Sequence, residues 1–297
     1  MTGASLARRG LLGGAAATLF AACARAAAPG PEGPERGRLR EQVFRVPIVV
    51  RGQDSPLLLV ATVFRPPGPG PFPLALVNHG SPRSAADRRA ITRHRYSAAS
   101  AWFVARGYAV AVPSRRGYAT SEGDFVEGPG PCAAPRYEAA GETSANDIAG
   151  ALAWFQQQSF VASDRVVLVG QSAGGWGVLA LAARDPPGVR CALNFAGGRG
   201  SPSAGVVCAP DRLAQAAATF GARTRIPSLW IYTENDTYQP PEVSGRVAAA
   251  YRAAGGPADY TLLPPFKQDG HGLFADRDGV PVWAPLVAPF LVANGLD

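Results

Sequence analysis

Residues 166–183 of the chain read VVLVGQSAGGWGVLALAA and place a serine between two glycines. A short β-branched run ends at Val169, the motif Gly170-Gln171-Ser172-Ala173-Gly174 follows, and an alanine- and leucine-rich run begins at once. This order is typical of a nucleophile elbow, a strand–turn–helix junction so tight that only small residues fit beside the serine. The pattern predicts Ser172 as a nucleophile, and the alternative is an ordinary glycine-serine turn.

A serine hydroxyl is a weak nucleophile and needs a neighbouring base, most often a histidine. The chain has three histidines, His79, His94 and His271. His271 follows the last predicted strand in a glycine-flanked loop, which fits the chain order serine, acid, histidine. His79 precedes the serine and fits an oxyanion loop better, and His94 lies in an arginine-rich stretch that we expect at the surface. The sequence therefore predicts His271 as the base.

The third group of such a triad is a carboxylate that orients the imidazole and stabilises its charged form. Asp236 follows the apolar run 229–232 and lies between the serine and the histidine in the chain. Glu234 is the main alternative for this carboxylate. Asp269 is a weaker alternative, because a side chain two positions from His271 points elsewhere. The loop length favours Asp236.

Backbone N–H groups must bind the negative oxygen that forms during acyl transfer. The N–H of Ala173 is one candidate, and the second comes from Ser81 or Gly80, after the predicted strand 72–78. Polar and glycine-rich residues recur after several predicted strands. Because the carboxyl ends of parallel strands share one edge of a sheet, these residues are expected to form one site.

The elements that must position these residues alternate along the chain. Runs 43–50 and 57–64 are predicted to form an antiparallel pair. Later strands are separated by helices, which indicates βαβ units and a mainly parallel, doubly wound sheet with helices on both faces. The strands are expected at 72–78, 108–113, 166–169, 189–195, 228–232 and 260–263, and the helices at 97–106, 144–158, 176–183, 211–220, 242–254 and 282–294.

The first 28 residues have the layout of an export signal. The pair Arg8-Arg9 precedes an apolar, alanine-rich run to Ala22, and it resembles a twin-arginine signal. Residues 20–23 resemble a lipoprotein box in which Cys23 carries the lipid, and cleavage near 26–28 is the competing reading. We expect a periplasmic or secreted protein, with a linker at 29–40 and one folded domain at 41–297.

Composition and cysteine usage exclude several classes of function. Hydrophobic residues make up 47% of 297, and the net charge of +7 comes from scattered arginines, with a cluster from Arg83 to Arg95 that we expect to be a solvated face. No basic block alternates with aromatics, so nucleic-acid binding has little support. The sequence has no Cys/His cluster of the kind that binds a structural zinc ion. Cys132 and Cys208 lie in Gly/Pro-rich loops and are the candidate disulfide, and Cys191 is expected to be a buried thiol.

Over residues 41–295 the chain resembles the α/β-hydrolases, and within them the secreted dienelactone-hydrolase-like serine esterases. The resemblance is carried by residues 78–81, 115–118, 121–123, 170–174, 234–236 and 269–271. It implies the α/β-hydrolase fold and ester hydrolysis by Ser172, Asp236 and His271. Dienelactone hydrolases have a cysteine in the elbow, so their substrate is not implied. The loop 115–118 is also similar to that of prolyl-oligopeptidase-type domains, so peptidase activity remains an alternative function.

The substrate is less well defined by the sequence. Segment 197–211 is short and 117–143 is the longest insertion, which predicts no large lid and an open site for a small-molecule ester. Arg115 and Arg116 are expected at its rim, where they meet a substrate carboxylate or where Arg116 braces the loop. His79, Tyr118 and Gln171 are further candidates for substrate contact.

The remaining expectations concern partners and alternatives. We expect no metal or organic cofactor, no nucleic acid, and contact with a membrane only through a lipid on Cys23, and the oligomeric state stays open. The alternatives to an esterase are a serine exopeptidase and a non-catalytic hydrolase-fold binding protein.

Overall fold

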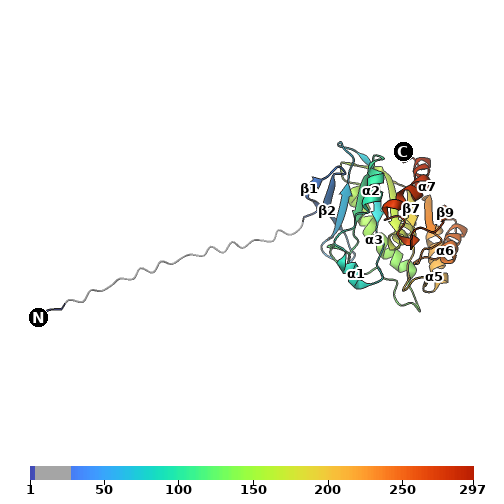
Figure 1. Ribbon diagram of the computed structural model, residues 1–297, viewed down its shortest axis with the longest axis horizontal. Helices are drawn as coiled ribbons and strands as arrows, with labels where there is room; N and C mark the ends of the chain where they lie inside the picture. The colour runs from blue at the N-terminus through green and yellow to red at the C-terminus, as the bar shows by residue number, and fades with distance from the viewer. Residues whose placement is uncertain (4–27) are drawn as a thin grey trace.

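The computed structural model of the protein describes residues 1–3 and 28–297. This part of the chain contains one nine-stranded sheet in the order β1-β2-β3-β5-β4-β6-β7-β8-β9 (Figure 1). The pairs β1–β2, β2–β3 and β3–β5 are antiparallel, and every later pair is parallel. The strands are β1 Gly30–Arg36, β2 Glu41–Ile48, β3 Leu57–Phe64, β4 Phe72–Asn78, β5 Ala109–Pro113, β6 Val161–Gln171, β7 Val189–Phe195, β8 Ser228–Thr233 and β9 Ala258–Leu263.

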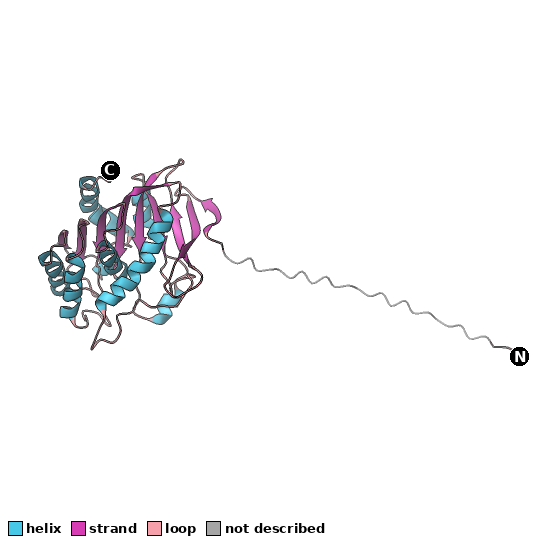
Figure 2. Ribbon diagram, turned by 180° about the vertical axis from the view of Figure 1, so that it is seen from behind, coloured by secondary structure: helices cyan, strands magenta, loops and turns pink. Residues whose placement is uncertain are grey.

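Helices cover both faces of this sheet. The cluster of buried residues on one face includes side chains of α3, α4, α5 and α6, and the cluster on the other face includes α2 and α7. Figure 2 shows the long helix α3 lying across the strands. The mainly parallel, doubly wound architecture is therefore confirmed. The helices are α1 Ala85–Ala90, α2 Ser97–Val104, α3 Tyr137–Phe155, α4 Ala173–Ala182, α5 Pro210–Gly221, α6 Pro241–Ala253 and α7 Val280–Ala293.

The two cores follow from the alternation of side chains along each strand. In β6, Val166 and Leu168 pack on the face of α3 and α4, whereas Val167 and Val169 pack on the face of α2 and α7. Because both faces are buried, the central strands are continuous apolar runs without polar alternation. The buried sheet is a rigid platform for the loops that leave its carboxyl edge.

The predicted linker at 29–40 is wrong in part, because Gly30–Arg36 forms the edge strand β1. Prolines are tolerated on an edge strand, where every second N–H faces away from the sheet. Pro31 and Pro34 occupy this strand, and Glu32 on it pairs with Arg45 at 3.0 Å. The proline- and glycine-rich composition thus concealed a paired segment.

The expected helix 144–158 begins seven residues earlier, at Tyr137. The segment between β5 and this helix is correspondingly shorter than the sequence indicates. A disulfide between Cys132 and Cys208 joins this segment to the loop before α5, which confirms the predicted pair. Cys191 is a buried free thiol, as expected.

The predicted export signal and the lipidation of Cys23 fall largely on residues 4–27, which lie outside the described residues. Among the helices that the structure describes, none combines the length and apolar character needed to cross a membrane.

Candidate active site

Ser172 lies at the junction of β6 and α4, with φ 53° and ψ −122°. A positive φ on a residue other than glycine costs of order 1–3 kcal/mol and is concentrated at functional sites. The turn is held because the Ser172 N–H donates to the Phe195 carbonyl at 2.9 Å. The glycines on either side of Ser172 cannot be replaced without a clash with backbone atoms. A Cβ on Gly174 would lie 2.2 Å from the Asn78 carbonyl oxygen, and one on Gly170 would lie 2.5 Å from the Gly174 carbonyl oxygen.

Asp236 and His271 meet although they are far apart in the chain. The Nδ1 atom of His271 lies 2.9 Å from Oδ1 and 3.1 Å from Oδ2 of Asp236. Asp236 Oδ1 also accepts the backbone N–H groups of Tyr238 at 2.8 Å and Gln239 at 2.9 Å. Its side chain is fully buried, whereas that of His271 is 12% exposed. The carboxylate is thereby fixed at the Nδ1 edge of the imidazole, and the Nε2 atom on the other side of the ring is not engaged by it.

The two rival carboxylates make different contacts. Glu234 is exposed to solvent. Asp269 accepts the N–H of His271 at 3.0 Å and the N–H of Thr237 at 3.1 Å, so it holds the loop rather than the ring. Although burial opposes it, hydrogen bonds from Thr237 and His271 hold the pKa of Asp269 below its ordinary value. Of the three candidate carboxylates, Asp236 is the one that contacts the imidazole ring of His271.

The predicted oxyanion donors come from the end of β4 and the start of α4. Gly80 packs against Ser172, since a Cβ on Gly80 would lie 3.1 Å from the serine Cβ. Its own N–H donates to the Tyr96 hydroxyl at 3.3 Å, which leaves Ser81 as the better candidate of the two. Ser81 and Ala173 both line the cavity beside Ser172. Ala173 is the first residue of α4, where a backbone N–H has no helical acceptor.

Tyr96 connects this loop to the histidine loop. Its hydroxyl accepts from Gly80 and donates to Gln171 Oε1 at 2.7 Å, and Gln171 Nε2 donates to the His271 carbonyl at 2.8 Å. Burial raises the pKa of Tyr96 to about 12, so its proton stays in place. Gln171, which the sequence suggested as a substrate contact, thus ties the elbow to His271.

His79 and His94 form a stacked pair with ring centroids 3.6 Å apart. His79 Nε2 accepts the Arg115 N–H at 3.0 Å, so Nδ1 carries the proton toward the Gly80 carbonyl at 2.8 Å. Burial, followed by the charge of Arg115, keeps the pKa of His79 well below its ordinary value, and burial lowers that of His94 to about 3. His79 is fully buried and does not line the cavity beside Ser172, so the structure does not support the substrate contact expected for it. His94 is partly exposed, and its ring packs on His79 rather than standing free on the surface.

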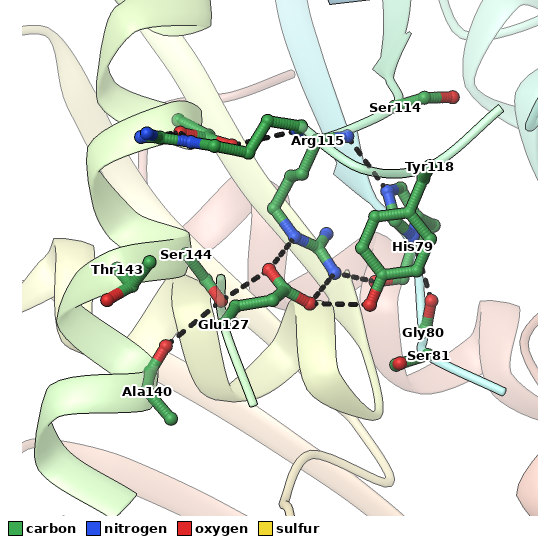
Figure 3. Close-up of polar contacts among 12 residues, drawn as sticks. His79, Gly80, Ser81, Ser114, Arg115, Tyr118, Glu127, Ala140, Thr143 and Ser144 are labelled. Carbon is green, nitrogen blue, oxygen red and sulfur yellow. Dashed lines mark hydrogen bonds and ion pairs between the residues drawn. The ribbon is translucent and has the colours of Figure 1, made fainter. Parts of the chain in front are cut away.

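Arg115 is buried rather than at the rim of the site. Its Nε lies 2.6 Å and one terminal nitrogen 3.0 Å from the Glu127 carboxylate, and its side chain is 1% exposed (Figure 3). Glu127 also accepts the hydroxyl protons of Tyr118 and Ser144, each at 2.7 Å. Arg115 and Tyr118 are therefore directed to Glu127 and not to a ligand, which corrects the sequence expectation.

Arg116 braces its loop, which was the alternative reading. Its backbone N–H donates to Asp147 Oδ2 at 2.9 Å and its Nε donates to Oδ1 at 2.7 Å. Asp147 lies on α3 and is buried in this pair. Trp176 lies in the core, and its indole N–H donates to the Tyr137 carbonyl at 2.8 Å.

A cavity of about 330 Å³ opens beside Ser172. The disulfide joins two of its walls, since both Cys132 and Cys208 line it. The charged side chains of the lining are Arg83, Arg88 and Arg199. The cluster from Arg83 to Arg95 is thus only in part the solvated face that we expected.

Sequence reasoning missed Arg199, Glu127 and Tyr96. Arg199 follows β7 at the same edge of the sheet as the other candidates, so the strand-end rule applies to it as well. Glu127 and Tyr96 lie in irregular loops, where the sequence carries no comparable signal. Among the residues that the structure describes, no group of three or more His, Cys, Asp or Glu side chains is arranged to hold a metal ion.

Comparison with solved structures identifies the fold. Dipeptidyl peptidase 4 of Porphyromonas gingivalis superposes with a TM-score of 0.62 at 17% identity, over 87% of this chain and 36% of that one. An acetyl xylan esterase from Paenibacillus sp. R4 gives 0.58 at 17% identity, over 86% and 83%. A putative dienelactone hydrolase from Klebsiella pneumoniae gives 0.51 at 16%, over 83% and 96%. The chain thus spans about a third of the first of these proteins. No curated protein sequence matches it significantly.

The sheet, its helices and these likenesses define the α/β-hydrolase fold. The family described as X-Pro dipeptidyl-peptidase (S15 family) matches residues 54–238, and the chain belongs to it. It is a hydrolase of the α/β-hydrolase type, with structural neighbours among both esterases and peptidases.

Proposed function

We propose that this hydrolase cleaves carboxylic esters through an acyl-enzyme formed on Ser172. Two observations carry the proposal: the contact of His271 with Asp236, and the strained backbone of Ser172 in a nucleophile elbow whose Gln171 donates to the His271 carbonyl. A carboxylate on Nδ1 keeps that proton in place and leaves Nε2 as the base. The same constellation supports the roles expected from the sequence for all three residues.

In the first step Ser172 Oγ attacks the ester carbonyl while His271 Nε2 takes the hydroxyl proton. The N–H groups of Ala173 and Ser81 donate to the oxygen that becomes negative. Collapse of this intermediate expels the alcohol, which receives the proton from His271. Water then attacks the acyl-enzyme with the same histidine as base, and the acid and free Ser172 are released.

An ester is favoured over the peptide substrate of a dipeptidyl-peptidase, the exopeptidase activity that the family description suggests. An enzyme that trims peptides from the amino end needs a negative group for the α-ammonium of its substrate. The described lining of the cavity contains arginines and no Asp or Glu. A cationic wall disfavours an ammonium group by like-charge repulsion, so the exopeptidase is the second candidate.

The test is fluorophosphonate labelling of the folded protein beside Ser172→Ala, with both proteins assayed on p-nitrophenyl esters and on an X-Pro p-nitroanilide. We expect labelling and ester turnover in the unaltered protein and loss of both in the variant, by about 10⁶-fold for turnover. Turnover of the anilide alone would make the exopeptidase the function. A folded protein that neither labels nor turns over would favour a binding role.

We also propose that the protein acts outside the cytoplasm. The disulfide between Cys132 and Cys208 is consistent with an oxidising compartment. Mass analysis of the amino terminus of the native protein tests this: an acylated Cys23, or a start near residue 28, supports export, and an intact Met1 contradicts it.

A further inference from the structure

The charged side chains that line the cavity beside Ser172 are all positive. Three arginines line it, and no acidic side chain does so within the described chain. They come from two separate segments: Arg83 and Arg88 lie around α1, and Arg199 lies in the loop after β7. A cavity with charges of one sign on its walls selects ligands of the opposite sign.

Arg199 is the buried member of this set, with a side chain 4% exposed. One terminal nitrogen lies 3.0 Å from Glu127 Oε1 and donates to the Ser144 hydroxyl at 2.6 Å. Its Nε is buried and makes no hydrogen bond within the described structure. A buried donor without an acceptor costs about 1–3 kcal/mol, more when it is charged, so an acceptor supplied by a ligand at Nε would be favourable.

The surrounding cluster carries an uncompensated positive charge. Glu127 is one carboxylate that faces two guanidinium groups, those of Arg115 and Arg199 (Figure 3 shows Arg115 on Glu127). Although burial opposes it, the charges of Arg115 and Arg199 hold the pKa of Glu127 well below its ordinary value. With His79 neutral, the sum is one excess positive charge. An unpaired buried charge is unfavourable, and an anion would neutralise it.

Arg83 and Arg88 are held at the rim without ion pairs. The Arg83 guanidinium lies 3.5 Å from the ring centre of Tyr238, and that of Arg88 lies 4.0 Å from Phe125. Arg83 donates only to neutral oxygens, those of Ser201 and Thr237. Neither has a carboxylate within ion-pair distance in the described chain. Two oriented guanidinium groups without acidic partners are suited to a planar carboxylate.

We propose that the preferred esters of this enzyme carry a carboxylate, which Arg199 binds within the cavity and Arg83 and Arg88 attract at its rim. The proposal rests on the proposed ester hydrolysis at Ser172. The carboxylate belongs to either the acyl part or the alcohol part of the ester, and the substrates of the test distinguish the two.

The test compares kcat/KM, followed by proton release, for anionic esters and neutral esters of matched length. Monomethyl esters of C4–C8 dicarboxylic acids are set against methyl alkanoates, and acetylated ω-hydroxy acids against alkyl acetates. We expect about a tenfold preference for one anionic series at low salt, which is about one charge-assisted hydrogen bond, and a smaller preference as salt screens the rim. Equal rates for anionic and neutral esters would overturn the proposal.

Three variants locate the effect: Arg199→Gln, Arg83→Gln and Arg88→Gln. Each is expected to lower the ratio of anionic to neutral kcat/KM. The rim variants keep the test decisive if Arg199→Gln does not fold. Arg252→Gln is the matched control, because it removes the same charge from an exposed position on α6, outside the cavity. A ratio that no cavity variant lowers, or that Arg252→Gln lowers equally, would overturn the proposal.

A binding measurement separates this inference from the proposed function. Calorimetric titration of Ser172→Ala with adipate is expected to show binding that Arg83→Gln and Arg88→Gln weaken. If adipate binds but no ester is hydrolysed by the unaltered protein, the ester function fails and the anion site stands. If neutral esters are hydrolysed without preference and adipate does not bind, the anion site fails and the function stands.

Discussion

At the residue scale, the site depends on contacts between side chains and backbone that hold two loops together. Tyr96 accepts from Gly80, beside the proposed oxyanion donor Ser81, and donates to Gln171, which in turn donates to the His271 carbonyl. Tyr96 therefore acts as a positioning residue. It couples the loop after β4 to the histidine loop through one hydroxyl group.

Replacement Tyr96→Phe removes this hydroxyl and keeps the ring that packs on Phe274. We expect kcat for a neutral ester to fall about tenfold or more with little change in KM, because two hydrogen bonds of about 0.5–1.5 kcal/mol each are lost from the positioning of the site. Steady-state kinetics measures the split. Tyr108→Phe is the control, because it also removes a buried hydroxyl, which donates to the Leu296 carbonyl at 2.6 Å. Equal kinetic effects of the two variants would argue against positioning by Tyr96.

At the scale of elements, the site requires that α4 start directly against the end of β4. Gly174 is the point of closest approach: a Cβ there would lie 2.2 Å from the Asn78 oxygen and 2.5 Å from the His79 oxygen. These are backbone atoms, which cannot move aside as a flexible side chain does. The second glycine of the motif is thus a packing requirement of the strand–helix junction.

Gly174→Ala is therefore expected to lower the free energy of unfolding by about 3 kcal/mol, the upper range for forced overpacking. Gly245→Ala is the matched control, since Gly245 lies inside α6 with nothing within 4 Å of the added Cβ. There the same change should raise stability by about 0.5–1 kcal/mol, because alanine favours the helix. Urea unfolding measures both. Similar small effects at the two positions would contradict the packing argument.

At the scale of the whole molecule, the stacked pair of His79 and His94 makes the free energy of unfolding depend on pH. His79 from the end of β4 stacks on His94 from the loop before α2, and His94 Nδ1 lies 2.8 Å from the Ser114 hydroxyl after β5. The pKa of both histidines is lowered by burial. A lowered pKa means that the unfolded chain binds protons that the folded protein excludes.

The contribution of the two neutral histidines to the free energy of unfolding should therefore be complete above pH 6.5. It should decrease as the pH falls from 6.5 toward the folded-state pKa, which is about 3 for His94. The slope approaches about 1.4 kcal/mol per pH unit for each histidine. Urea unfolding between pH 7 and 5, above the titration of unfolded carboxylates, isolates this contribution in a His271→Asn background. Adding His94→Asn should reduce the slope by half. A flat profile would refute the neutral pair.

The elbow could be predicted from sequence because its requirement is local. A tight turn between a β-branched run and a small-residue helix needs glycines at fixed spacing, and Ser172 lies where that pattern indicates. The strand alternation and the order of the central elements are local as well. Composition misled at β1, where prolines occupy an edge strand.

The sequence by itself predicted the fold class, the nucleophile elbow around Ser172, the candidate base among three histidines, and Cys132 and Cys208 as the candidate disulfide. Only the tertiary structure decided which side chains are partners: Asp236 rather than Glu234 against His271, and Glu127 against both Arg115 and Arg199. The reason is physical. A turn or a strand is selected by neighbours in the chain, whereas a buried charge is placed by groups that folding brings together from distant segments.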